Sequence, residues 1–297
     1  KAEEVLVCST GVIGVPLPMD KIKAGIDLCS KELGESREAA FEAALAICTT
    51  DTFTKEVAVS LQIEGRTVHI GGMAKGSGMI HPNMATMLSF ITTDANVDKQ
   101  TLQTLLGSSI TDTYNMISVD GDTSTNDTVL VLANGMSETT PLCPSHPQWE
   151  QFTQAFLYVH TELAKAIVRD GEGAGKFLEV KVTGAKDKQT AQTLARSVIT
   201  SNLVKTAFFG SDANWGRILC AMGYSGADFN PSTLDLYFSS AKGTIQVVKN
   251  GTPLAFDEHL AKGILMEREI VTLAQLQDGI GEGTAWGCDL SYEYVRI

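Results

Sequence analysis

Residues 71–91 place a glycine-rich loop directly before an apolar run, and this stretch constrains the fold more than any other. Four of the eight residues 71–78 are glycine, and Lys75 is the charged residue among them. Glycine permits positive φ and a close approach of the backbone to a ligand. The mostly apolar residues 87–91 predict a buried strand. Thr86 at the junction is therefore either an ordinary strand residue or a reactive group at the edge of the core.

The composition leaves room for one large or two ordinary domains, since 43% of the 297 residues are hydrophobic. A net charge of −12 disfavours nucleic acid and anionic membranes as partners. No apolar run reaches the length of a membrane span, and we expect no signal peptide. The six scattered cysteines favour reduced thiols inside a cell. The five histidines are not grouped as zinc ligands, so we expect no metal.

Strand and helix patterns are mixed without strict alternation, which predicts an α+β fold of layered sheets and helices. A hairpin is expected at Glu64-Gly65. The expected strands are 5–8, 57–63, 68–70, 87–91, 129–133, 177–182, 234–238, 244–248 and 269–274. The expected helices are 19–29, 36–48, 98–114, 149–169, 187–199, 217–222 and 257–265. We place a domain boundary after Gly175, with a catalytic α/β domain at 1–175 and a smaller C-terminal α+β domain at 176–297.

Three common motifs fail when their spacing is checked. A phosphate-binding Walker loop needs lysine followed by serine or threonine and then a helix, but Lys75 is followed by glycine. Residues 120–131 begin like a calcium-binding EF-hand loop, but Thr125 and Val131 replace the required glycine and glutamate. No Gly-x-Ser-x-Gly elbow supports a serine-histidine-aspartate triad. His81 lies near Thr86 in sequence but is expected to be a surface or loop residue.

A threonine nucleophile remains open. Its hydroxyl is weak unless a base is adjacent, and an N-terminal threonine supplies that base with its own α-amine. This amine titrates near pH 8, as a general base at working pH should. The chemistry would require cleavage of the peptide bond between Ala85 and Thr86. The small Ala85 and the lead-in with Pro82 are compatible with such cleavage.

Acyl transfer also needs hydrogen-bond donors for an oxyanion and charges for the substrate. Thr10 and Gly11 follow an expected strand in a glycine-containing turn, where they can offer a hydroxyl and an amide. Lys75 and Glu172 each sit in a glycine-rich loop that can present a charge to a small ligand. For each of them a solvated loop charge is the ordinary alternative.

Eight motifs, in order and over nearly the whole chain, resemble the ornithine acetyltransferase (glutamate N-acetyltransferase) family of arginine biosynthesis. They are Ser9-Thr-Gly-Val-Ile-Gly14, Thr49-Thr-Asp-Thr52, Lys75-Gly-Ser-Gly-Met-Ile80, Pro82-Asn-Met-Ala-Thr-Met-Leu88, Asp122-Thr-Ser-Thr-Asn-Asp-Thr128, Asp170-Gly-Glu-Gly-Ala174, Asp212-Ala-Asn-Trp-Gly-Arg217 and Gly287-Cys-Asp-Leu290. Each motif alone is weak, and the ordered set is specific.

The resemblance implies a layered fold shared with self-cleaving aminopeptidases, and a precursor that cleaves itself at Ala85-Thr86 into α and β chains that stay together. It implies that Thr86 takes the acetyl group of N-acetylornithine and passes it to glutamate in a ping-pong cycle. Thr10 and Gly11 match the family's oxyanion hole. The substrate-binding positions of the family match Thr52, Lys75, Thr86 and Glu172. The resemblance implies no metal and no organic cofactor.

Partners and compartment follow from the same resemblance. N-acetylornithine and glutamate are the expected substrates, some members also accept acetyl-CoA, and αβ units are expected to form a homo-oligomer. The residues of the motifs most resemble those of fungal members, which implies the mitochondrial matrix. The bacterial cytoplasm is the alternative. Family members extend beyond this chain at both ends, so we expect a fragment or a processed product. A self-cleaving hydrolase and a non-enzymatic binding protein remain as alternatives.

Overall fold

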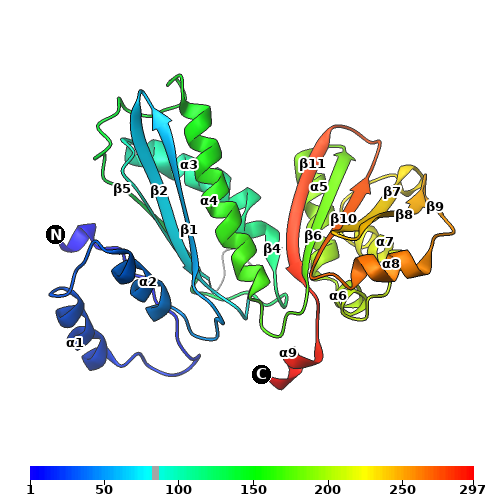
Figure 1. The fold of residues 1–297 in the computed structure, drawn as a ribbon, viewed down its shortest axis with the longest axis horizontal. Coiled ribbons are helices and arrows are strands. Elements are labelled where there is room, and N and C mark those ends of the chain that lie inside the picture. Colours follow the sequence, from blue (N-terminus) through cyan, green and yellow to red (C-terminus); the bar gives the residue numbers. More distant parts are fainter. Residues whose placement is uncertain (82–86) are drawn as a thin grey trace.

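The computed structural model describes residues 1–81 and 87–297, and it consists of two sheets with helices packed on them (Figure 1). The expected α+β layering is confirmed. The predicted cleavage site, Ala85-Thr86, lies outside the described residues. Among the described helices, none is long and apolar enough to cross a membrane.

The first sheet has four strands in the order β1-β2-β3-β5. The hairpin of β1 and β2 turns at Glu64 and Gly65, whose φ angles of 53° and 76° fit the expected tight turn. β2 pairs antiparallel with β3, and β3 pairs parallel with β5. The strands are β1 (Lys55–Ile63), β2 (Arg66–Lys75), β3 (Leu88–Thr93) and β5 (Thr128–Ala133). β2 is longer than expected, so that Lys75 is the last residue of a strand instead of part of a loop.

The second sheet has seven strands in the order β4-β11-β6-β10-β7-β8-β9. They are β4 (Ile117–Ser118), β6 (Phe177–Ala185), β7 (Asp235–Ser240), β8 (Gly243–Lys249), β9 (Thr252–Pro253), β10 (Glu269–Gln275) and β11 (Gly281–Cys288). β4 comes from the N-terminal half of the chain and pairs with β11, so one short strand crosses between the halves. The domain boundary after Gly175 lies between helix α4 and β6, and the division into two domains stays a prediction.

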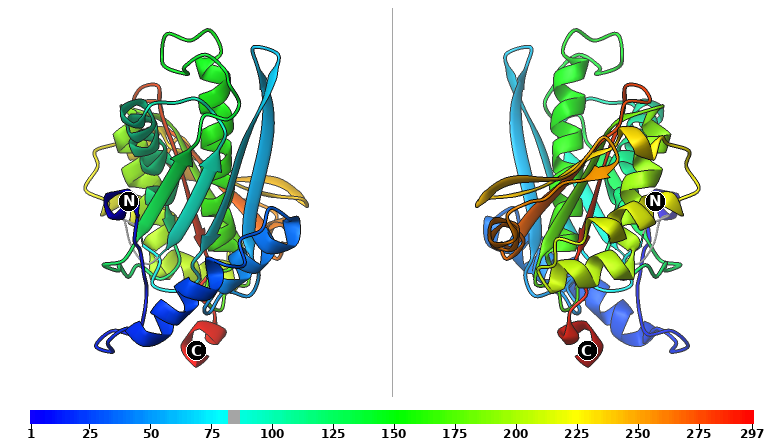
Figure 2. Two further views of the ribbon diagram at one scale, coloured as in Figure 1. Left: turned by 90° about the vertical axis from the view of Figure 1, so that its left-hand side faces the viewer. Right: turned by 90° about the vertical axis from the view of Figure 1, so that its right-hand side faces the viewer.

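Helix α4 lies between the two sheets in Figure 1, and the side views of Figure 2 show it alongside the strands of the first sheet. It packs against β1 and β2 on one side and β11 on the other. Its spacing of Phe152, Phe156, Val159 and Leu163 puts these apolar side chains on one buried stripe. The helices are α1 (Met19–Cys29), α2 (Arg37–Ala46), α3 (Lys99–Asp112), α4 (Trp149–Arg169), α5 (Lys188–Thr200), α6 (Asn202–Phe209), α7 (Trp215–Gly223), α8 (Glu258–Leu265) and α9 (Tyr292–Arg296).

The N-terminal residues are the least buried part of the chain. α1 has no buried residue and α2 has one, Ala44. The strand expected at residues 5–8 is wrong, because these residues lie outside every helix and strand and Val5 and Val7 are exposed. A short apolar run forms a strand only when a neighbouring strand pairs with its backbone hydrogen-bonding groups, and the run itself does not reveal whether such a neighbour exists.

Candidate functional site

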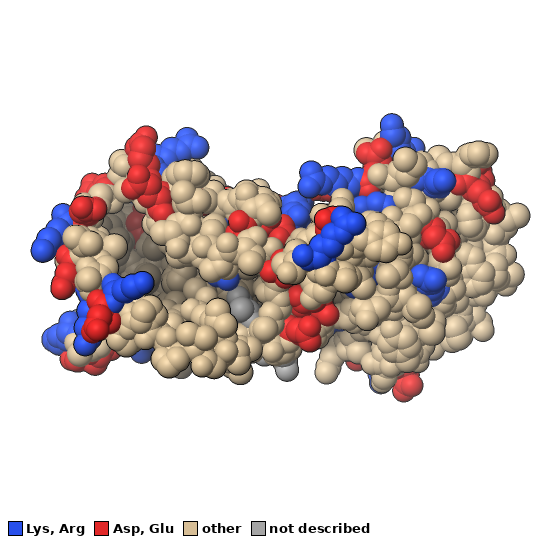
Figure 3. Space-filling view, turned by 90° about the horizontal axis from the view of Figure 1, so that it is seen from below, with Lys and Arg blue, Asp and Glu red and all other residues tan. Residues whose placement is uncertain are grey.

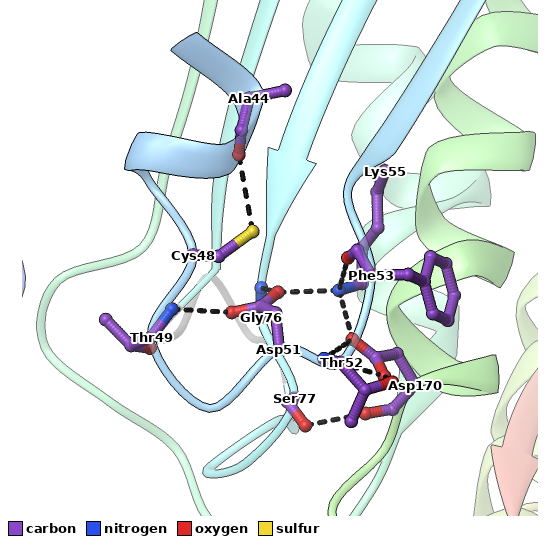
Figure 4. Close-up of polar contacts among 10 residues, drawn as sticks. All are labelled: Ala44, Cys48, Thr49, Asp51, Thr52, Phe53, Lys55, Gly76, Ser77 and Asp170. Atoms are coloured by element: carbon purple, nitrogen blue, oxygen red, sulfur yellow. Dashed lines mark hydrogen bonds and ion pairs between the residues drawn. The ribbon is translucent and has the colours of Figure 1, made fainter. Parts of the chain in front are cut away.

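Two buried carboxylates share one buried lysine where the first sheet meets the end of α4. Lys55 Nζ lies 2.6 Å from Asp51 Oδ1 and 2.5 Å from Asp170 Oδ2, and all three side chains are excluded from solvent (Figure 4). Lys55 begins β1 and Asp170 follows α4. Buried charges are tolerated when they are paired and hydrogen-bonded. This trio therefore ties the residues at the start of β1 to the end of α4.

The segments that carry the expected ligand groups are fastened to this trio. Thr52 donates its backbone N–H to Asp170 Oδ2 at 3.0 Å, and its hydroxyl donates to the same carboxylate. Asp51 Oδ1 accepts the amide of Gly76 at 2.7 Å, and Ser77 Oγ donates to the carbonyl of Asp170 at 2.6 Å. Burial would raise the pKa of Asp51, but the bonds from Gly76 and Lys55 hold it below its usual value. These bonds therefore fix Gly76 and Ser77 of the glycine-rich loop to the Asp51–Lys55–Asp170 trio.

Lys75 carries a buried cation at the end of β2. Lys75 is 5% exposed, and no hydrogen bond or ion pair joins its side chain to a residue in 1–81 or 87–297. A buried ammonium group without a partner is energetically costly. An anionic ligand that bound here would offset this cost, and the role of Lys75 in binding substrate stays a prediction.

Glu172 contacts the same glycine-rich loop at Ser77 and Gly78. Its backbone N–H donates to Ser77 O at 2.9 Å, and its carboxylate lies over Gly78, where a Cβ atom would overlap it. Two further carboxylates, Asp120 and Asp122, lie near Glu172 around the phenol of Tyr294. Burial and these three acidic groups raise the pKa of Tyr294 to about 12. On the face seen from below, acidic side chains gather near the junction of the two halves of the molecule (Figure 3).

The loop before β5 brings the Thr10-Gly11 turn to this region. Asn126 Nδ2 donates to the carbonyl of Ser9 at 2.9 Å. The next residue, Asp127, accepts the amide of Met87 with Oδ1. Thr10 is half-buried and Gly11 is exposed, and neither has a hydrogen bond to the described residues around it. The structure thus brings this turn beside the loop that contacts the start of β3.

Residues 82–86, which include the expected Ala85-Thr86 cleavage site, are flanked by two well-anchored residues. Met87 is bonded through its amide to Asp127 and through its carbonyl to the amide of Thr128 at 3.0 Å. His81 contacts Ser118 Oγ at 3.2 Å and Arg196 at 3.1 Å. His81 lies in a loop, as expected, and it is half-buried there. Burial and Arg196 lower the pKa of His81, because both disfavour its protonated form.

Sequence reasoning missed four charged residues at this site: Asp51, Lys55, Asp127 and Asp170. Asp51 and Asp170 stand inside two of the recognised motifs, and Asp127 stands in a third. Their partners lie far away in sequence, so no local pattern could pair them. The signal that was present is the charged residue Lys55 at the start of an otherwise alternating strand, where a buried partner is required.

A protein-family profile described as "ArgJ family" matches residues 1–297. The chain is 54% identical over 295 residues to the arginine biosynthesis bifunctional protein ArgJ of Caldanaerobacter subterraneus, with 99% of this chain and 73% of that protein covered. It is 53% identical over 296 residues to the protein of the same name from Staphylococcus aureus, with 100% and 70% covered.

A crystal structure of arginine biosynthesis bifunctional protein argJ from Bacillus halodurans is similar to this structure, with a TM-score of 0.68 and 48% identity. The match covers 71% of this chain and 98% of that one. The relatives named are all bacterial proteins, so they favour the bacterial alternative and give no support to the mitochondrial expectation.

Proposed function

The chain belongs to the ArgJ family, and on this premise we propose that it transfers the acetyl group of N-acetylornithine to glutamate through an acetyl-Thr86 ester. The main observation behind this proposal is that two opposite charges, those of Lys75 and Glu172, lie beside the glycine-rich loop. Lys75 offers a buried cation without a partner in 1–81 or 87–297, and Glu172 offers a carboxylate over Gly78. Ornithine and glutamate both carry an α-carboxylate, and released ornithine carries amines, so both charges find partners.

The roles of the remaining residues follow from the chemistry of acyl transfer. After cleavage between Ala85 and Thr86, the α-amine of Thr86 takes the proton of its own hydroxyl as Oγ attacks the acetyl carbon. Thr10 Oγ1 and the amide of Gly11 donate to the oxyanion. The contact between Asn126 and Ser9 supports this placement of the turn. Thr52 binds substrate from the position in which Asp170 holds it.

The two chains produced by cleavage would remain together because the cut falls between two paired strands. β2 and β3 share a ladder that runs from Ile70 and Thr93 to Lys75 and Leu88. Breaking the connection between Lys75 and Leu88 leaves every bond of that ladder intact. Exposed apolar side chains near the N-terminus, such as Val7 and Ile13, support association of αβ units into a homo-oligomer. We place the protein in the bacterial cytoplasm.

The deciding experiment follows the acetyl group. Purified protein is incubated with N-acetylornithine, and mass spectrometry is expected to find two chains meeting at Thr86 with an added acetyl group on the second. Addition of glutamate should release it as acetylglutamate, while loss of the group to water would instead indicate a hydrolase. Thr86→Ala is expected to abolish both cleavage and transfer. A fully active, uncut chain would refute the mechanism. Acetyl-CoA is tested in parallel as a second donor.

A further inference from the structure

The residues that follow β11 are bonded to the loop that carries Glu172. Asp289 Oδ1 accepts the backbone amide of Gly175 at 2.8 Å and that of Lys176 at 2.9 Å, and the Asp289 amide donates to Lys176 O at 3.2 Å. Figure 1 shows the chain leaving β11 and running on to α9. We call residues 288–294 the 288–294 segment. It belongs to the second half of the chain and touches a loop of the first half.

The glycines of that loop mark where the 288–294 segment touches it. Ser291 Oγ donates to the carbonyl of Gly173, and a Cβ on Gly173 would lie 2.3 Å from the amide nitrogen of Tyr294. A Cβ on Gly171 would lie 3.2 Å from Cys288 Sγ. Glycine at residue 173 therefore allows the two backbones to lie in direct contact.

The turn that is held in this way determines where the Glu172 side chain points. Ala174 N–H donates to Gly171 O at 2.8 Å, which closes a turn with Glu172 and Gly173 as its two central residues. Gly173 has a φ of 67°, which favours glycine at the second central position of such a turn. From this turn the Glu172 carboxylate extends over Gly78. A change in the turn would move the carboxylate.

The 288–294 segment is itself held by a buried lysine of α6. Lys205 is 2% exposed, its Nζ donates to Cys288 O, and its carbonyl accepts the amide of Leu290 at 3.4 Å. Asp289 is buried, and its Oδ2 has no hydrogen-bond partner in residues 1–81 and 87–297. A buried carboxylate with one unbonded oxygen is costly to the fold. This cost favours a role for Asp289 in holding the loop over one in stability alone.

The next step rests on the proposed function, in which Glu172 binds the amine of ornithine. We propose that Asp289 and Ser291 are positioning residues for acetyl transfer, and that they hold residues 171–175 so that the Glu172 carboxylate stays over Gly78. A charge-assisted hydrogen bond weakens steeply when its distance and angle are lost. The second half of the chain thereby sets the substrate affinity of a site built on the first half.

Two mild substitutions test this role by steady-state kinetics. Ser291→Ala removes the hydroxyl that bonds Gly173, and Asp289→Asn keeps an accepting oxygen but loses the charge that strengthens its two bonds. Each should raise KM for N-acetylornithine about threefold to tenfold, with kcat little changed. Ser291→Thr, which restores the hydroxyl, should return KM to the wild-type value. Circular dichroism verifies that each variant is folded.

A double-mutant cycle shows whether the effect passes through Glu172. In a Glu172→Gln background, Ser291→Ala and Asp289→Asn should raise KM no further, because the side chain that they position has already lost its charge. Substitutions that act independently of Glu172 would multiply KM by the same factor in both backgrounds. A purely structural role would therefore give a different result.

The second half of the chain offers a matched control for each substitution. Ser197 Oγ donates to the carbonyl of Ala221 at 2.6 Å, so Ser197→Ala loses the same kind of bond as Ser291→Ala. Asp257 Oδ1 accepts two backbone amides, those of His259 at 2.8 Å and Leu260 at 3.1 Å, so Asp257→Asn matches Asp289→Asn. Both controls should keep the wild-type KM and kcat.

Three results would overturn the inference. They are a wild-type KM in folded Ser291→Ala and Asp289→Asn, a rise in KM that multiplies with that of Glu172→Gln, and a Glu172→Gln variant with wild-type KM, which would leave no binding role to position. Failure of the proposed function looks different. The wild type itself would then transfer no acetyl group from N-acetylornithine to glutamate, whereas failure of this inference leaves wild-type transfer intact.

Discussion

Gly78 is kept small by the carboxylate that lies over it. A Cβ atom added there would overlap Glu172, but the obstacle is the end of a flexible side chain and the backbone of Gly78 is not in the left-handed region. Gly78→Ala should therefore fold and displace the Glu172 carboxylate. If Glu172 binds the amine of ornithine, losing one charge-assisted hydrogen bond should raise KM for N-acetylornithine about tenfold, with a smaller effect on kcat.

The control for this change is Gly107→Ala, because nothing lies within 4 Å of the added Cβ in α3. Steady-state kinetics on both variants decides the matter. An unchanged KM in Gly78→Ala, with Gly107→Ala also unchanged, would exclude Glu172 from substrate binding.

At the scale of single residues, the sequence pointed to candidate ligand-binding groups, whose roles stay predictions, and did not point to the residues that support them. Lys75 and Glu172 were predicted because glycine-rich sequence surrounds them, although Lys75 is the last residue of β2. Asp170 supports Thr52 across 118 residues of chain, and Asp127 contacts Met87 across 40. Sheet pairing and the packing of α4 bring such partners together. No local sequence pattern indicates which distant residues will meet in this way.

His160 makes α4 sensitive to acid. It is fully buried against Tyr114 and Phe156, and neither ring nitrogen has a partner among the described residues. Burial lowers the pKa of His160 to about 4 from an ordinary 6.5. The unfolded chain therefore binds a proton that the folded chain refuses between these values, so stability is complete above pH 6.5 and falls as the pH drops towards 4.

This shift corresponds to a loss of about 2 kcal/mol in the free energy of unfolding between pH 7.5 and pH 5. His160→Leu should remove that part of the pH dependence, and at pH 7.5 it should be neutral or stabilising because two unsatisfied nitrogens disappear. Urea titrations at the two pH values measure it. His259→Leu, on the exposed side of α8, is the control. An equal drop in wild type and His160→Leu would contradict the assignment.

Among the elements, those with strong local patterns were predicted and those defined by their neighbours were not. Helix 149–169 was expected with its observed bounds, because its apolar stripe is sustained over many turns. β11 was missed because glycine dilutes its strand pattern. The glycines of β11 allow α5 to pack close to the strand. A Cβ on Gly283 would overlap the backbone of Gln192, and one on Gly287 would contact Ile199 too closely. Close packing, not a turn, explains them.

The whole molecule is joined across its middle by α4 and β4. α4 packs on β1, β2 and β11, and β4 pairs Ile117 with Trp286 of the second sheet. The buried hydrophobic core is one continuous cluster that contains residues of both halves. A sequence boundary after Gly175 marks where the chain passes from one sheet to the other, and the shared core implies that neither half keeps its stability without the other.

We therefore expect one cooperative unfolding transition for the two sheets. Trp149 begins α4 and stacks near Phe152, while Trp286 lies in β11 with its Nε1 donating to Glu179 at 2.8 Å, so each reports on a different half. A chain with Trp149 as its sole tryptophan and a chain with Trp286 as its sole tryptophan are compared by fluorescence in urea. Midpoints normalised to circular dichroism of the same chain should coincide, since loss of β4 pairing removes support from β11. Two separated midpoints would show that the halves fold independently and that the boundary after Gly175 divides the stability as well as the chain.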